Sequence, residues 1–162
     1  MKNTFAKVYL PIFVSIIIFS ACDQNKIYDA YVDLEENTWH IDTLPTFNLE
    51  IADNQIPYDI SYNIRYADFY PYYNIYLKYF LEDSTSTIIG SELQEIILFD
   101  KKTGNPLGEG LGDIFDRQAL VFSGFKFPAS GKYTFKVKQF MRTDKLPGIM
   151  SFGLRVDKQA SD

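Results

Sequence analysis

Cysteine and histidine are almost absent, since the 162-residue sequence contains one of each, Cys22 and His40. A single cysteine cannot form a disulfide within the chain, so burial of side chains must hold the fold together. Zinc sites use clusters of His and Cys, and nucleophilic triads need a base held near a Ser or Cys. His40 stands beside Trp39, and we interpret it as a surface or turn residue. The sequence therefore predicts no metal site, no cofactor beyond a covalent lipid and no catalytic residue.

A hydrophobic run long enough to span a membrane is also missing. The apolar run at residues 8–19 has 12 residues, whereas a spanning helix needs about 20. Two lysines, Lys2 and Lys7, precede this run, and Ser20 and Ala21 follow it directly before Cys22. A basic start, a short apolar core and small residues before a cysteine are typical of a bacterial lipoprotein signal peptide. We predict cleavage before Cys22 and lipidation of its thiol, with palmitate among the acyl chains.

The predicted organisation is a signal peptide (1–21), a lipidated tether (22–26) and one domain (27–158). Removing residues 1–21 takes away two lysines and no acid, so 14 basic and 21 acidic residues remain, a net charge of −7. This charge argues against non-specific binding to nucleic acid. Apolar residues make up 46% and aromatic residues 17% of the sequence, which is ample for a packed core.

Period-two alternation dominates the mature chain, and no amphipathic helix is convincing. The clearest case is 57–66, where Tyr58, Ile60, Tyr62, Ile64 and Tyr66 share one face, as in a strand with one dry side. Other strands are predicted at 27–34, 46–52, 72–81, 85–89, 93–101, 119–127, 131–141 and 149–156. This count, with turns about every ten residues, predicts an all-β, two-sheet antiparallel sandwich, jelly-roll or immunoglobulin-like. We expect strands 57–66 and 72–81 to form an antiparallel pair.

The glycine-rich segment 107–116 (LGEGLGDIFD) permits two interpretations. Glu109, Asp113 and Asp116 are candidate oxygen ligands for calcium, although no regular calcium-loop spacing accompanies them. The interpretation we favour is a tight loop in which glycines adopt positive φ. The carboxylates of Glu92, Glu95, Asp113 and Asp116 are also candidates for a glycosidase pair, but spacing along a chain does not fix the distance between two carboxyl groups.

Aromatic residues are concentrated between Tyr58 and Tyr79, which contains eight of the twelve tyrosines. Alternation places most of them in the core. Those at the turn around Tyr70 and Tyr72, together with Tyr76 and Phe80, are expected to form an exposed patch, and such patches mark partner surfaces or sugar-stacking platforms. We favour a protein partner.

Several short motifs together resemble the gliding-motility lipoprotein GldH family. The resemblance covers nearly the whole chain, and its most specific parts are Ile64-Arg65 with Tyr70-Pro71 and the stretch from Gln139 to Ile149. The remaining matches are Cys22, Tyr28-Asp29, Trp39, Tyr58-Asp59-Ile60, Tyr72-Tyr73-Asn74, Gly110 to Ile114, Phe127, Gly131-Lys132-Tyr133 and Gly153. The chain departs from the family at Leu107-Gly108-Glu109, where an aromatic residue is common.

The resemblance implies a non-enzymatic lipoprotein of the cell envelope, anchored at the outer membrane on its periplasmic or outer side. Its expected role is in gliding motility and the associated type IX secretion machinery, through docking of protein partners. Candidate contact residues are Arg65, Tyr70, Tyr72 and Arg142. The alternative function is a glycan-binding sandwich lipoprotein of a nutrient-uptake complex, and a glycosidase is a third option.

We expect Cys22→Ala to release the protein from membranes and to abolish its function. Acyl chains contribute about 0.8 kcal/mol per buried methylene, so their loss removes the anchor. Fractionation of cells into membrane and soluble protein, followed by a motility assay, measures both effects. A soluble but fully active Cys22→Ala variant would contradict the expectation.

Overall fold

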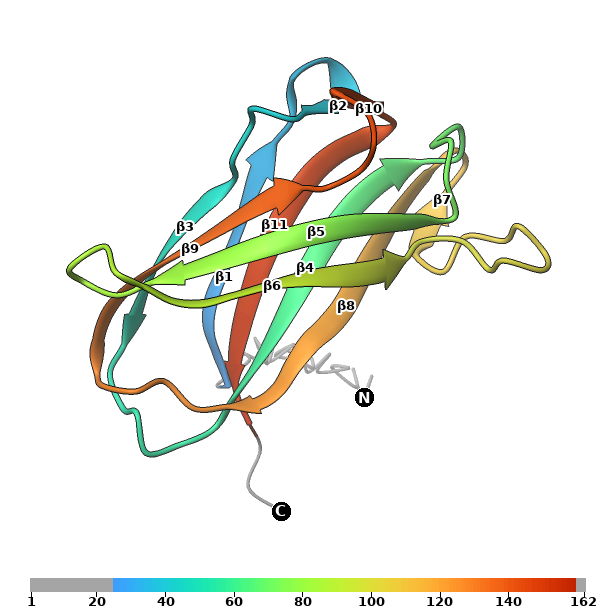
Figure 1. Cartoon of the computed structure of the whole chain (residues 1–162). Helices are drawn as coiled ribbons and strands as arrows, with labels where there is room; N and C mark the ends of the chain where they lie inside the picture. The colour runs from blue at the N-terminus through green and yellow to red at the C-terminus, as the bar shows by residue number, and fades with distance from the viewer. Residues whose placement is uncertain (1–24, 160–162) are drawn as a thin grey trace, which may run out of the picture.

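The computed structural model of the chain describes residues 25–159, in which two antiparallel sheets pack face to face (Figure 1). The predicted all-β sandwich is confirmed. The predicted signal peptide, Cys22 and the first tether residues lie outside the described residues. Within 25–159 there is no helix long and apolar enough to cross a membrane.

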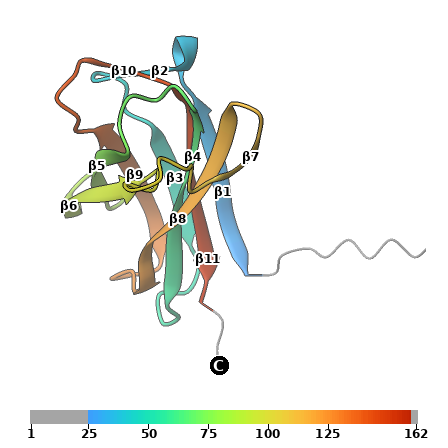
Figure 2. The same cartoon turned by 90° about the vertical axis from the view of Figure 1, so that its right-hand side faces the viewer.

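Every strand pairing is antiparallel. The five-stranded sheet has the order β1 (Lys26–Asp33), β11 (Ile149–Lys158), β4 (Tyr58–Ala67), β8 (Ile114–Phe125) and β7 (Glu109–Leu111). The four-stranded sheet has the order β3 (Thr46–Ile51), β9 (Gly131–Gln139), β5 (Asn74–Glu82) and β6 (Ile88–Ile97). A small ribbon joins β10 (Lys145–Pro147) to β2 (Thr38–His40), which follows the 3-10 turn η1 (Glu35–Asn37). Figure 2 shows the layers from the side, with β5 and β6 opposite β1 and β7.

The core lies between the sheets and is rich in aromatic rings. The five residues predicted for the dry face of β4 are all buried, as are Ile75, Leu77, Tyr79 and Leu81 of β5. Phe152 of β11 lies at the centre, with its ring centroid 5.1 Å from Tyr62, 5.2 Å from Trp39 and 6.0 Å from Phe47. Each large side chain buried in this way contributes roughly 1.5–3 kcal/mol.

The expected pairing of strands 57–66 and 72–81 is wrong, because β4 and β5 belong to different sheets. β4 pairs with β11 and β8, whereas β5 pairs with β9 and β6. Alternation fixes which face of a strand is buried, but it does not identify the neighbouring strand. The loop at 68–73 therefore crosses from one sheet to the other, so that the dry faces of β4 and β5 meet across the core.

Two further boundaries differ from prediction. The expected strands 85–89 and 93–101 form one strand, β6, in which Gly90 pairs with Leu81. The glycine-rich segment is a hairpin of β7 and β8, with Gly112 at a φ of +69° in its turn. A Cβ at Gly110 would collide with the carbonyl oxygen of Ile114, so this glycine permits close pairing of the two hairpin strands.

The predicted tether enters at one end of the sandwich. There Lys26 pairs with Asp157, and the Lys158 amide donates to the carbonyl of Asn25 at 2.8 Å. β4 and β8 also have their Tyr58 and Phe125 ends here, since these two residues pair. The β2–β10 ribbon and the β4–β5 loop lie at the opposite end (Figure 1).

We expect Phe152→Ala to lower the free energy of unfolding by about 3–5 kcal/mol, because it leaves a cavity among three aromatic rings. Urea titration of the detergent-solubilised lipoprotein, followed by tryptophan fluorescence, measures the change. Phe152→Leu is the matched control and should cost clearly less. Equal stability of the alanine variant and the parent would show that this contact does not hold the sheets together.

Candidate functional site

A groove of about 810 Å³ lies where β9 ends and β5 begins, on the outer side of the four-stranded sheet. We call it the aromatic groove. Four aromatic side chains line it, together with apolar, amide and cationic residues: Tyr72, Tyr73, Tyr76, Phe140, Ile41, Leu93, Met141, Asn74, Gln139, Lys138 and Arg142. The end of β9 and the start of β5 lie in the half of the sandwich away from Lys26 (Figure 1).

Buried polar side chains hold the walls of this groove in place. Gln139 is 0% exposed; its Nε2 donates to the Thr143 carbonyl at 2.9 Å, and its Oε1 accepts from the Met141 amide at 2.8 Å. The Gln139 amide thus satisfies backbone groups on the turn after β9. On the other wall, the Tyr73 carbonyl accepts from the amides of Leu98 and Phe99 at 2.8 and 2.9 Å. These bonds fix the backbone from which Tyr72, Tyr73 and Phe140 project.

The groove combines exposed aromatic surface with positive charge. Tyr72 is 41% exposed, Tyr73 37% and Phe140 52%. Lys138 and Arg142 add two cations to the lining, and Lys78 Nζ lies 5.9 Å from the Phe140 ring centroid. Nearby, the Glu95 carboxylate is the main cause that raises the pKa of Tyr76. Such a surface can bind a partner whose apolar side chains are surrounded by acidic residues.

The structure separates the four candidate contact residues. Tyr72 and Arg142 line the aromatic groove together. Tyr70 is buried, and its hydroxyl donates to the Asn74 carbonyl at 2.9 Å. Burial raises the pKa of Tyr70 strongly, with a smaller contribution from Tyr72. A side chain in this position supports the loop that carries Tyr72.

Arg65 lies on the other sheet, where the pairing of β4 with β8 places it opposite Asp116. Arg65 Nε and Nη2 donate to the two Asp116 carboxylate oxygens at 2.9 and 3.0 Å. This bidentate bond is the main cause that raises the pKa of Arg65. Both side chains are about half exposed, at 52% and 55%. Arg65 and Arg142 therefore belong to different surfaces.

The acidic candidates do not form a shared centre. Across residues 25–159, no three carboxylate, histidine or cysteine side chains gather as a metal site requires, so the calcium interpretation is unsupported. Glu109 pairs with Asp116 across the hairpin, and Asp116 binds Arg65. Glu95 is on the four-stranded sheet and bonds to Asn74, so it cannot pair with Asp116 on the other sheet as a glycosidase would need.

Sequence patterns missed most of the groove. Ile41, Leu93 and Lys138 come from segments far apart in the sequence, and alternation contains no information on which segments meet. Sequence reasoning did place Tyr72 and Tyr76 in an exposed patch and Arg142 among the candidate contact residues, and all three line the groove. A further signal was Phe140, an aromatic residue on the same predicted strand face as Thr134, Lys136 and Lys138. Exposed aromatic residues indicate a functional surface where several gather in one patch.

The comparisons with known proteins agree with the residue motifs. The profile of the GldH lipoprotein family matches residues 26–156. The chain belongs to the GldH lipoprotein family. A Christiangramia forsetii protein named "Gliding motility lipoprotein GldH homolog" is 33% identical over 98% of both chains. A Flavobacterium johnsoniae protein named "Gliding motility lipoprotein GldH" is 27% identical over 90% of this chain and 92% of that one.

Solved structures resemble this member of the GldH family only distantly. Infectious bursal disease virus, Gx strain, matches with a TM-score of 0.34, 11% identity and 85% coverage of this chain. Dimeric latent PorU from Porphyromonas gingivalis matches with a TM-score of 0.31, 11% identity and 86% coverage. The chain spans 31% and 14% of those two chains. Likeness at this level carries no functional argument.

We expect Arg65→Ala to change the free energy of unfolding by less than about 1 kcal/mol, because exposed ion pairs contribute little to stability. Asp116→Ala and the double variant complete a thermodynamic cycle, which urea titration at low and high salt can measure. Arg142→Ala is the control for loss of an exposed arginine on the other sheet. A loss of several kcal/mol for Arg65→Ala would make Arg65 a structural residue.

Proposed function

We propose that this chain is a lipid-anchored, non-enzymatic protein of the cell envelope that acts in gliding motility and the associated type IX secretion machinery. It works by docking a protein partner in the aromatic groove. Membership of the GldH lipoprotein family, with relatives named for gliding motility, supports the process. The aromatic groove supports the mode of action, because it is built for contact and holds no evident catalytic constellation.

The place where the tether enters supports an orientation for the domain. Three residues separate Cys22 from Lys26, and four residue steps of extended chain reach about 13 Å. A lipid on Cys22 therefore keeps the Lys26 end of the sandwich at the membrane surface. The end of β9 and the start of β5, which carry the aromatic groove, lie in the opposite half (Figure 1) and are therefore farther from the anchoring leaflet. Confinement at one surface raises the effective concentration of the groove against membrane partners.

The composition of the groove favours a protein as its occupant. Aromatic residues, Met and Arg are enriched at protein interfaces, and hot spots are commonly Tyr, Trp or Arg. Tyr72, Tyr73, Phe140, Met141 and Arg142 supply this set along one groove. The domain is acidic overall, whereas the groove contributes Lys138 and Arg142. The fitting partner surface has apolar side chains ringed by Asp or Glu.

A glycan is the second candidate for the same groove, because exposed rings also stack on sugars. Tyr76 lies on β5 and Phe140 directly follows β9, and the Phe140 amide donates to the Tyr76 carbonyl at 2.8 Å. Their rings extend the surface that Tyr72 and Tyr73 begin. This arrangement would suit a glycan-binding lipoprotein of a nutrient-uptake complex.

We expect Tyr72→Ala and Arg142→Glu each to reduce capture of the protein partner at least tenfold, since one hot-spot residue contributes 2 kcal/mol or more. Intact cells are cross-linked, and the full-length lipoprotein is purified from their membranes. Its cross-linked partners and the spreading of colonies are then measured.

Lys102→Glu is the matched control, since it reverses an exposed charge outside the groove. Wild-type capture and motility in both groove variants would exclude the groove as the docking site. Capture of a glycan in place of a protein would favour the second candidate.

A further inference from the structure

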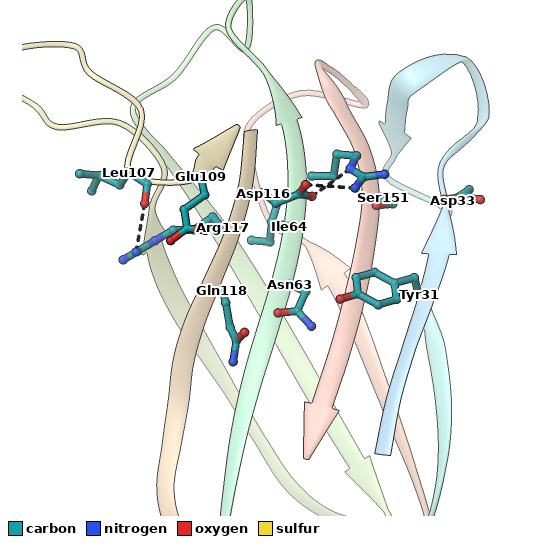
Figure 3. Close-up of a pocket in the computed structure, with 11 residues that line it drawn as sticks. Tyr31, Asp33, Asn63, Ile64, Leu107, Glu109, Asp116, Arg117, Gln118 and Ser151 are labelled. Carbon is teal, nitrogen blue, oxygen red and sulfur yellow. Dashed lines mark hydrogen bonds and ion pairs between the residues drawn. The ribbon is translucent and has the colours of Figure 1, made fainter. Parts of the chain in front are cut away.

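The outer face of the five-stranded sheet holds a second, polar groove of about 660 Å³, shown in Figure 3. Strand register arranges its side chains in rows. One row runs Glu109, Asp116, Arg65, Ser151, Asp33 across β7, β8, β4, β11 and β1. The next row runs Gln118, Asn63, Gly153, Tyr31 across β8, β4, β11 and β1. The small residues Asn63, Ser151 and Gly153 form the floor, on β4 and β11. Larger residues of β8 and β1 form the walls.

The floor contains polar side chains that are buried although they lie on an outer face. Asn63 is 9% exposed and Ser151 is 5% exposed. Among residues 25–159, the buried side-chain polar atom without a hydrogen-bond partner is Nε of Arg117, which also lines this groove. A buried donor without a partner is unfavourable by roughly 1–3 kcal/mol. Together with the Asn63 amide and the Ser151 hydroxyl, it favours a ligand that carries both donors and acceptors.

A glycine places an aromatic ring on the wall of this groove. A Cβ at Gly153 would lie 2.6 Å from Tyr31 Cδ1, so the bare glycine lets the ring rest on β11. Tyr31 is nevertheless 56% exposed. One side of the ring is therefore supported by the sheet, while much of its remaining surface faces solvent. Figure 3 shows Tyr31 across the groove from Asn63 and Gln118.

The charges around the groove select against anions. Three carboxylates line it, Asp33, Glu109 and Asp116, against two cations, Arg65 and Arg117. Asp116 already binds Arg65, and Arg117 Nη1 donates to the Leu107 carbonyl at 3.2 Å. The pKa of Tyr31 is raised, first by partial burial and then by the carboxylates of Asp29 and Asp116. A negatively charged ligand would meet repulsion here.

The size and lining of the groove distinguish it from a protein interface. Interfaces have an apolar core and bury about 800 Å² on each partner, whereas most of the residues that line this groove carry an amide, hydroxyl or ionic group. Its volume lies in the range of small-ligand sites. Asn63 and Gln118 each offer donors and an acceptor, which match hydroxyl groups. The exposed ring of Tyr31 matches the C–H face of a pyranose.

We propose that this polar groove binds a neutral oligosaccharide. Asn63, Gln118 and Ser151 bond to the sugar hydroxyls, the Arg65–Asp116 pair closes one end, and Tyr31 stacks on a sugar ring. The site is independent of the aromatic groove, because it lies on the outer face of the opposite sheet.

The test is titration of the full-length lipoprotein, purified in detergent, with three neutral hexasaccharides: cellohexaose, maltohexaose and mannohexaose. Isothermal titration calorimetry should detect binding of at least one of them. Asn63→Ala and Tyr31→Ala should each weaken that binding at least tenfold. Tyr31→Phe should retain most of it, since the ring remains. Gln118→Ala changes an exposed residue and serves as the variant least able to disturb folding. Phe69→Ala, which removes an exposed ring outside both grooves, is the matched control and should bind like the parent.

Three results would overturn the proposal. The first is absence of binding by all three hexasaccharides at millimolar concentration. The second is binding that survives Asn63→Ala, Gln118→Ala and Tyr31→Ala unchanged. The third is equal or tighter binding of an acidic chain of the same length, hexagalacturonate. Thermal melting of every variant separates loss of the site from loss of the fold.

Discussion

A continuous chain of aromatic ring contacts between the two sheets is the constraint on which the rest of the structure depends. It runs from Trp39 through Phe152, Tyr62, Phe135, Tyr79, Phe122, Phe125 and Phe127 to Tyr133. Neighbouring centroids are 4.8 to 6.2 Å apart. Each such pair contributes about 0.5–1.5 kcal/mol beyond its burial. With no disulfide available to the domain, these rings join β2, both sheets and the β8–β9 turn.

The same rings also determine where the loops lie, because buried tyrosine hydroxyls need partners. Tyr66 donates to the Leu98 carbonyl at 2.7 Å and accepts from the Gly108 amide at 3.2 Å. It thereby holds both ends of the 98–108 loop against the core. Tyr70 donates to the carbonyl of Asn74 and so positions the start of β5. The aromatic groove is thus an extension of the core, built on loops that core tyrosines hold in place.

Sequence reasoning identified the faces of the strands but not their neighbours. The alternation of apolar and polar residues in β4 correctly predicted its buried tyrosines, because side chains two residues apart lie on the same face of a strand. The partner of β4 depends on residues 50 or more positions away, such as Asp116, and a hydrophobic pattern does not encode that choice. Tyr70 and Tyr72 show the same limit at the site. These two residues of one motif differ in burial, since Tyr70 is 5% exposed and Tyr72 is 41% exposed.

A sandwich has two outer faces, and in this chain their chemistry differs. The four-stranded sheet presents aromatic rings with Lys138 and Arg142, while the five-stranded sheet presents amides, hydroxyls and carboxylates. Packing alone requires neither arrangement, since an outer face is stable when it is merely polar. The buried, unpartnered Nε of Arg117 beside one outer face and the exposure of Phe140 on the other both have a cost in stability. Such departures from the simplest sandwich are expected where a surface has a binding role, and here they occur once on each sheet.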